Sequence, residues 1–300
     1  MKRRELPTTR SQRNSRPSLR KGEKSRLVPS VVGAMRILDF IGTSGRAIGR
    51  HVHLAVGMNA STTHQILKTL VHGGYLHYEE ETKQYTLGPV LTALGAASSS
   101  NSQVGRIARP YMRRWVRETA FTAFLARELP DHSSVIVDKV ESTLDIKTTL
   151  EVGQRFPSTA GAIGKAFMAW LPEAELKEIL SSDALKPFTA TSIRERAQWL
   201  QELERVRKLG WAESRGEHNP SNNAVAAPIR SPHGEVVLVV GSLASRSDMA
   251  DERLGHFGQA IQQVAERIAA GVFGTALGNG GQLTEQSSVA TSQRQIRLNA

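Results

Sequence analysis

Three short segments of helical periodicity, each followed by glycine, lie between residues 30 and 74 and constrain the fold more than any other feature. In the first segment Ser30 is expected to cap a helix, and the apolar residues that recur on one face of that helix are Val31, Met35, Leu38 and Ile41. The second segment spans 48–56 and precedes Gly57, and the third restarts at Asn59. Three short helices with a tight turn before the third predict a helix-turn-helix.

A β-hairpin is predicted directly after these helices. Apolar and polar residues alternate at 75–78 and again at 84–87, and the polar run 79–83 separates the two stretches. Such a hairpin forms the wing of a winged helix-turn-helix, which we expect at 27–88. A connecting helix is expected next and ends in the serine-rich stretch 98–102. Residues 89–102 are therefore expected to link two domains.

The rest of the chain predicts an α+β domain at 103–275. The expected helices are 104–119, one that starts near Gly161, 173–180, one that begins at Ser192 with Glu195 as its capping-box partner, and 254–272. The expected strands are 121–127, 134–140, 144–150, 224–229 and 236–243. Mixed strands between helices on a single sheet are typical of a sensor-like domain. The composition of 276–300 predicts a disordered tail.

Positive charge is concentrated at the N-terminus. The chain of 300 residues carries a formal charge of +11, and residues 1–26 contribute +8 of it, from ten cationic and two acidic side chains. That segment has no apolar period, so it predicts a flexible basic arm. Binding of a polyanion through counterion release and a solvated tail that aids solubility both remain open.

Several classes of protein are excluded by what the sequence lacks. Without cysteine there is no disulfide framework, thiolate metal site or cysteine nucleophile. No apolar run approaches the roughly 18 residues of a membrane span, and no secretory signal is recognisable, so we expect a cytoplasmic protein without membrane contact. No catalytic motif is present, and His51 and His53 lack the spacing at which a helix holds a metal. We therefore expect no enzyme, no cofactor and no metal site.

The third helix has the polar residues of a DNA-recognition helix. Those expected to point outward are Ser61, Thr62, Thr63, His64, Gln65 and Lys68. Hydroxyl groups at a helix N-terminus can donate to phosphate, and glutamine can pair with an adenine edge in the major groove. Arg50 in the second helix and Lys83 in the hairpin complete the expected DNA-binding set. An ordinary amphipathic helix with a solvated face is the alternative that this pattern alone leaves open.

Over about residues 30–275 the chain resembles the IclR family of bacterial transcription regulators. The matching stretches are 30–38, 61–70, 74–76, 85–88, 153–157, 164–166, 210–212 and 226–229, which fall in the family's order and spacing. The resemblance implies a transcription regulator with a winged helix-turn-helix and a GAF-like effector-binding domain. It also implies a homodimer or dimer of dimers on double-stranded operator DNA, and a small organic acid, a carboxylate, as effector.

The same resemblance implies the positions of the effector site. The backbone amides of Ala162 and Ile163 would hold the effector, and the other pocket positions would be Ser214, Ala224, Gly241 and either Ser242 or Leu243. Two departures from the family stand out, because Gln65 replaces the usual arginine and Ala224 replaces the usual cysteine or serine. The second departure predicts a less polar pocket. A DNA-binding protein whose C-terminal domain only dimerises is the alternative function.

Overall fold

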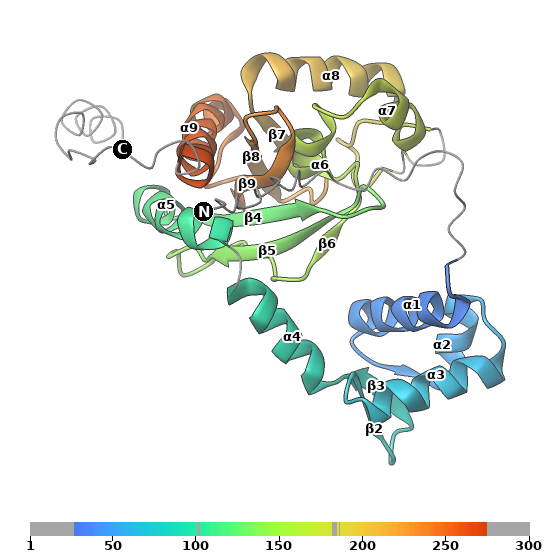
Figure 1. Cartoon of the computed structure of the whole chain (residues 1–300). Helices are drawn as coiled ribbons and strands as arrows, with labels where there is room; N and C mark the ends of the chain where they lie inside the picture. Colours follow the sequence, from blue (N-terminus) through green and yellow to red (C-terminus); the bar gives the residue numbers. More distant parts are fainter. Residues whose placement is uncertain (1–26, 101–102, 182–184, 186, 275–300) are drawn as a thin grey trace, which may run out of the picture. The chain divides into compact units, whose positions relative to one another are not determined.

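The computed structural model describes residues 27–100, 103–181, 185 and 187–274. The expected basic arm and C-terminal tail lie outside the described residues. The chain divides into two compact units between Ala97 and Ser98, and each is described by itself. The predicted fold class, a winged helix-turn-helix followed by an α+β domain, is confirmed (Figure 1).

The N-terminal unit consists of three helices, a small antiparallel sheet and a final helix. Its elements are α1 (Pro29–Ser44), β1 (Ala47–Ile48), α2 (Gly49–Val56), α3 (Ala60–His72), β2 (Leu76–Glu79), β3 (Gln84–Leu87) and α4 (Pro89–Ser100). The strand order is β1-β3-β2, so the predicted hairpin gains a third, two-residue strand that its own periodicity did not reveal. The turn before α3 follows the prediction, because Gly57 adopts a φ of 67° and the side chain of Asn59 accepts from the amide of Thr62 at 2.8 Å.

The prediction for α1 was wrong at the start of the helix and for half of the buried face. Pro29 occupies the first turn and Val28 is the cap, so Ser30 lies inside the helix. Of the predicted face, Val31 and Met35 remain 55% and 61% exposed, whereas Leu38 packs against the core and Ile41 is buried. Gly33 and Ile37 are the buried residues that the prediction missed. Gly33 lets α1 approach its neighbours, since a Cβ there would lie 2.6 Å from the sulfur of Met58.

The C-terminal unit is a six-stranded antiparallel sheet between two layers of helices. Its helices are α5 (Gln103–Thr119), α6 (Gly161–Met168), α7 (Glu173–Ile179), α8 (Arg196–Leu209) and α9 (Leu254–Phe273), with a 3-10 turn at Asp251–Arg253. Its strands are β4 (Thr122–Glu128), β5 (Ser134–Val140), β6 (Arg155–Phe156), β7 (Ala212–Arg215), β8 (Asn222–Arg230) and β9 (Val236–Ser245). The strand order is β6-β5-β4-β9-β8-β7.

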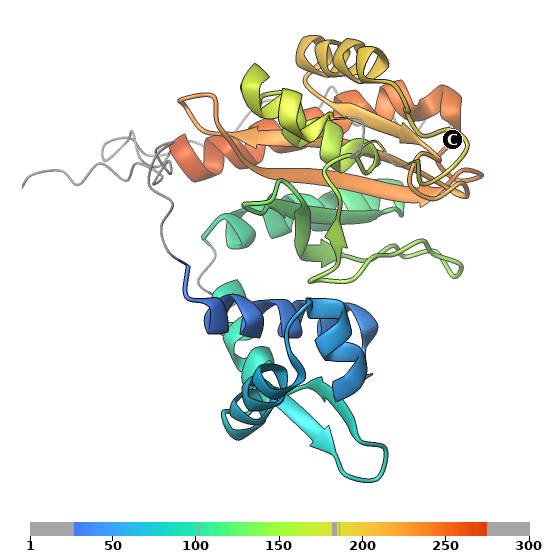
Figure 2. The same cartoon turned by 90° about the vertical axis from the view of Figure 1, so that its right-hand side faces the viewer.

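Helices cover both faces of this sheet (Figures 1 and 2), and each face has its own apolar core. On one face Phe124 and Val239 pack with residues of α6, α7 and α8. On the other face Leu125 and Val240 pack with residues of α5 and α9. Because side chains alternate along a strand, neighbouring residues of β4 and β9 serve different cores.

Two further predictions for this unit were wrong. Residues 144–150 form no strand, although Leu150 is buried and the carbonyl of Thr148 accepts from the hydroxyl of Thr122 at 2.7 Å. Ser192 does not cap α8, which starts at Arg196; its hydroxyl donates to the carbonyl of Glu217 at 2.7 Å instead. In the part of the chain that the structure describes, no helix is long and apolar enough to cross a membrane.

Candidate DNA-binding surface and ligand pocket

Helix α3 presents a polar face that begins directly after a tight turn. Ser61, His64, Gln65 and Lys68 are exposed and Thr62 is half-buried. The predicted outward position of Thr63 is wrong: the side chain is 1% exposed and its hydroxyl donates to the carbonyl of Asn59 at 2.9 Å. Thr63 precedes the buried Ile66 and Leu67 by three and four residues and so shares their face. It anchors the helix and does not reach out from it.

The two remaining candidate DNA contacts are also on the surface. Arg50 is exposed in the first turn of α2. Lys83 is exposed in the turn between β2 and β3, where its φ of 55° is left-handed. The candidate contacts therefore come from α2, α3 and the hairpin of a single compact unit.

A pocket of about 480 Å³, including its open mouth, lies in the C-terminal unit between the sheet and the start of α6. Its lining includes five of the residues expected to bind an effector, namely Ala162, Ile163, Ser214, Ala224 and Leu243. Ala224 and Leu243 are directly paired across β8 and β9. The lining is dominated by apolar side chains, in line with the departure at position 224.

The N-terminus of α6 faces this pocket with free backbone donors. Ala160 is the cap residue and provides no side-chain hydrogen bond, and Gly161, Ala162 and Ile163 line the pocket. Among the hydrogen bonds of the described residues, the amides of these three residues donate to no acceptor, whereas the amide of Gly164 donates to the carbonyl of Ala160 at 3.2 Å. Such a helix start attracts a negatively charged group.

The other two expected pocket residues are not part of the lining. Gly241 lies on the pocket face of β9 beneath Phe124, where a Cβ would come within 2.3 Å of the Phe124 ring. The glycine thus makes room for a lining residue. The prediction of Ser242 is wrong, because its side chain lies on the opposite face and its hydroxyl accepts from Trp115 Nε1 at 2.9 Å. Of the two alternatives, Ser242 and Leu243, it is Leu243 that lines the pocket.

Several lining residues were not predicted. They are Phe124, Leu150, Phe156, Ala160, Gly161, His218, Asn219 and Asn222. Phe124 follows from the alternation of β4 once β4 is known to pair with β9. Leu150 and Asn219 lie outside regular elements, where no periodicity marks which way a side chain points.

His218 is the titratable side chain of this lining. Its ring lies edge-on to two phenylalanine rings, with centroids 5.2 Å from Phe156 and 4.8 Å from Phe188. Burial lowers the pKa of His218, which favours the neutral imidazole. Its Nδ1 is buried and has no hydrogen-bond partner among the described residues.

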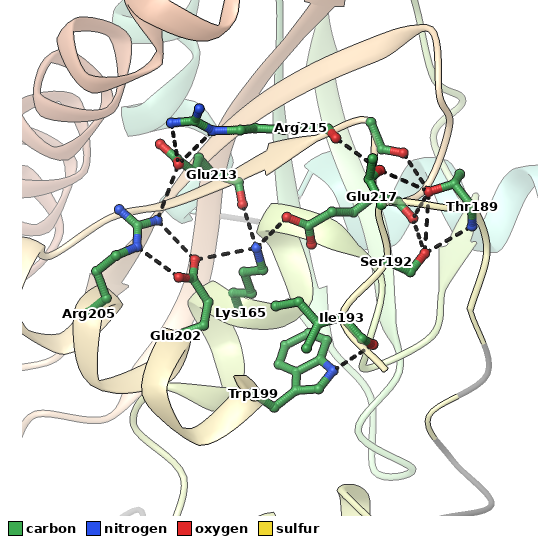
Figure 3. Close-up of polar contacts among 12 residues, drawn as sticks. Lys165, Thr189, Ser192, Ile193, Trp199, Glu202, Arg205, Glu213, Arg215 and Glu217 are labelled. Carbon is green, nitrogen blue, oxygen red and sulfur yellow. Dashed lines mark hydrogen bonds and ion pairs between the residues drawn. The ribbon is translucent and has the colours of Figure 1, made fainter. Parts of the chain in front are cut away.

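A cluster of charged side chains surrounds the buried Lys165 and does not line the pocket (Figure 3). The ammonium group of Lys165 in α6 is 2.6 Å from a carboxylate oxygen of Glu217 and 3.3 Å from one of Glu202, and it donates to the carbonyl of Glu213 at 2.9 Å. Lys165 itself is only 2% exposed. This single side chain therefore connects α6 to α8, to β7 and to the turn that carries His218.

The ionisation of this cluster follows from its partners. Burial raises the pKa of Glu217, and the charge and hydrogen bond of Lys165 act in the opposite direction. Burial also opposes ionisation of Glu202, yet the hydrogen bond from Arg205 and the charge of Lys165 lower the pKa of that carboxyl. The hydroxyls of Thr189 and Ser192 donate to the backbone carbonyl of Glu217 at 3.2 and 2.7 Å, which ties the segment before α8 to the same turn.

Together these features suit the pocket to an anionic ligand with an apolar body. Free amides lie at one end, and aromatic and aliphatic side chains form the walls, which is the usual composition of a small-molecule site. Within the described residues no group of three or more histidine and carboxylate side chains could hold a metal ion.

Comparison with known proteins gives matches to both units. The family model described as "IclR helix-turn-helix domain" matches residues 30–80. The family model described as "Bacterial transcriptional regulator IclR C-terminal" matches residues 96–270. The chain is 30% identical over 244 residues to the HTH-type transcriptional regulator KdgR of Escherichia coli, covering 81% of this chain and 92% of that protein.

Solved structures are similar as well. An IclR transcriptional regulator from Alicyclobacillus acidocaldarius has a TM-score of 0.73 at 28% identity, covering 81% of this chain and 98% of that chain. An IclR homologue from Microbacterium hydrocarbonoxydans, complexed with 4-hydroxybenzoate, has a TM-score of 0.66 at 17% identity, covering 81% of this chain and 99% of that chain. At that identity the second likeness concerns the fold alone.

Proposed function

The chain belongs to the IclR family of bacterial transcriptional regulators, and from this premise we propose that it binds operator DNA and releases or engages it in response to an organic acid. The observation that carries the effector part of the proposal is the pocket in which the free amides of Gly161, Ala162 and Ile163 meet apolar walls. The proposal has the protein act in the cytoplasm, beside the chromosome.

In this proposal α3 is the recognition helix. His64, Gln65 and Lys68 reach the major groove, and Ser61, Arg50 and Lys83 contact phosphates, while Thr62 lies at the helix start beside them. Glutamine is suited to an adenine edge and lysine to guanine or phosphate. Thr63 leaves the contact set because its side chain is buried.

The effector is an organic acid with an aromatic or aliphatic body. Its carboxylate would lie at the start of α6, and its hydrocarbon part would contact Phe124, Ala224 and Leu243. The fold-level neighbour from Microbacterium hydrocarbonoxydans holds 4-hydroxybenzoate, an acid of this class, which supports the choice of ligand.

Control of transcription then requires two arrangements of a homodimer or dimer of dimers. An effector shifts the balance only if it binds the operator-competent and operator-incompetent arrangements with different affinity. Because half-sites are spaced by helical turns of DNA, a modest change in the separation of two recognition helices weakens binding.

Calorimetry on the full chain with a panel of aromatic and small aliphatic acids tests the pocket. We expect binding of acids with an apolar body and at least a tenfold loss of affinity in Ala224→Asp, which places a carboxylate against the ligand in the lining. Ala197→Asp, at an exposed position of α8, is the matched control and is expected to bind like the wild type.

Two outcomes would contradict the pocket as drawn. One is binding of small hydrophilic acids such as glyoxylate alone, and the other is aromatic-acid binding that Ala224→Asp leaves intact. Recovery of bound genomic fragments with and without the identified acid tests the regulatory part, and an identical set and yield of fragments would refute effector control.

A further inference from the structure

The part of the DNA-binding unit that the structure describes is almost electrically neutral. Residues 27–100 contain five lysine and arginine side chains and four acidic ones, a net charge of +1. Three of those acids, Glu79, Glu80 and Glu81, lie at the tip of the hairpin. Because phosphate contacts supply much of the affinity of a protein for DNA, positive charge outside residues 27–100, on residues 1–26 or in the C-terminal unit, would add to DNA binding.

Helix α5 carries such charge outside the DNA-binding unit. Residues 101–300 have a net charge of only +2, yet α5 alone carries +4, from five arginines and one glutamate. The recognition helix α3, by contrast, contains one lysine. The inner face of α5 packs on the sheet through Ala108, Met112 and Trp115, so its charge is confined to the outer face.

Three of these arginines are free to bind a partner. Arg106, Arg113 and Arg117 are exposed, fall within about 40° of one another around the helix axis at 100° per residue, and form no ion pair among the described residues. The other two are partly engaged, Arg109 with Asp138 at 3.6 Å and Arg114 with Glu118 at 2.7 Å. Arg113 and Arg117 are one helical turn apart, an arrangement of like charges that weakens a helix unless an anion lies between them.

The dimensions of this stripe match the backbone of a duplex. Arg106 and Arg117 are about 16 Å apart along the helix, a length over which one strand of DNA presents roughly five phosphates. With α4 and the start of α5 helical at about 1.5 Å per residue and the other residues fully extended, the chain from Leu87, at the end of the hairpin, to Arg106 reaches at most about 40 Å, little more than one turn of a duplex. A DNA molecule held by α3 is therefore within tethering distance of the stripe.

We propose that Arg106, Arg113 and Arg117 of α5 form an accessory surface that binds the phosphate backbone of the same duplex that α3 reads. The inference rests on the proposed DNA binding and extends it to the unit that carries the ligand pocket. The contact is independent of base sequence, since guanidinium groups on phosphate oxygens position a protein without reading bases.

The test is the salt dependence of binding by the full chain to a recovered operator fragment and to a random-sequence duplex of the same length. Each phosphate contact contributes about 0.9 to the slope of log affinity against log salt. The triple variant Arg106→Gln, Arg113→Gln, Arg117→Gln should flatten the slope by about 0.9 to 2.7 on both duplexes. The corresponding triple lysine variant keeps the charge and should retain the wild-type slope.

A control of equal charge change is available on the opposite side of the sheet. Arg194, Arg196 and Lys208 are exposed near or in α8 and form no ion pair among the described residues, and their triple glutamine variant should leave the slope unchanged. Equal flattening in both glutamine variants would overturn the proposal, because it would show an effect of net charge alone. An unchanged slope in the α5 variant, with normal wild-type binding, would also overturn it. Absence of salt-dependent binding by the wild type would instead overturn the proposed function.

Discussion

Gly164 and Lys165 are consecutive residues with opposite demands on space. A Cβ on Gly164 would lie 1.9 Å from the carbonyl oxygen of Ser158, so only glycine lets α6 rest on that backbone. Lys165 lies about 100° further around the helix, and its ammonium group is enclosed by carboxylate and carbonyl oxygens. Gly164 thus sets how closely α6 packs on the backbone of Ser158, and Lys165 fixes the rotation of α6 about its own axis.

Protonation of His218 is expected to destabilise the C-terminal unit. Because burial lowers its pKa in the folded state, the unfolded chain binds a proton that the folded chain does not as the pH falls below about 6.5. The stability that neutral His218 contributes is therefore present above that pH and is lost as the pH falls through the folded pKa. For one proton the slope reaches at most about 1.4 kcal/mol per pH unit.

Tryptophan fluorescence during urea unfolding measures this effect, since the four tryptophans, Trp115, Trp170, Trp199 and Trp211, all lie in the C-terminal unit. Between pH 7.5 and 5.5 the free energy of unfolding should fall more steeply in the wild type than in His218→Gln. His77→Gln, at an exposed position of the hairpin, serves as control and should follow the wild type. Parallel curves for His218→Gln and the wild type would disprove the assignment.

At the scale of elements, the ion pair of Lys165 and Glu217 connects α6 to the turn between β7 and β8. Removing one partner leaves the other charge buried without compensation, which typically costs about 3–5 kcal/mol. Lys165→Met should destabilise the C-terminal unit by that amount, and adding Glu217→Gln should restore part of the loss. The control variant Lys147→Met removes the exposed ion pair with Glu141 and should lower the free energy of unfolding far less.

The double variant separates the two explanations of such a loss. If Lys165→Met and the double variant are equally unstable in urea unfolding, the loss does not come from the unpaired carboxylate of Glu217 but from the other contacts of Lys165. If the single variant unfolds like the wild type, the cluster does not hold the turn.

Elements with a clear period could be predicted from sequence, and those without one could not. The stripe of α9 and the turn at Gly57 and Asn59 are recovered because periodicity and turn residues are local properties. The start of α1 was misplaced because Pro29 begins the helix one residue before Ser30. The two-residue strand β1 exists only through pairing with Tyr85 and Gln84, a contact that no local pattern encodes.

The same distinction applies to the pocket. Ala162 and Ser214, which lie on α6 and β7, could be placed from the family resemblance, whereas Leu243 of β9 was one of two alternatives. The position of Ser242 depended on which face of β9 it occupies, and the pairing with β4 and β8 decides that. His218 lies in a turn whose position depends on the distant Lys165, so no pattern within the turn itself marks it.

At the scale of the whole molecule, positive charge is distributed over three places. Residues 1–26, outside the described residues, carry +8, and α5 adds an exposed stripe to the few cations of the DNA-binding unit. DNA affinity should therefore be strongly salt-dependent although the recognition helix has a single lysine.

Deletion of residues 1–26 should flatten the slope of log affinity against log salt by about 0.9 for each phosphate that this segment neutralises. Deletion of residues 275–300 removes a segment of similar length whose net charge is only +1, and it should leave the slope nearly unchanged. Full salt dependence in the N-terminal truncation would mean that the segment serves solubility and not binding.

None of the charged residues around Lys165 lines the pocket, which has a consequence for how a protein with the proposed sensing role would diverge. Ala224 and Leu243 face each other on neighbouring strands and form no side-chain hydrogen bond with the cluster. If the pocket binds the proposed effector, one or two codon changes at these positions would alter which metabolite fits and leave the ion pairs of Lys165 in place. Under the proposed function, a daughter copy made by gene duplication would then acquire a new effector without losing the ion pairs that hold α6.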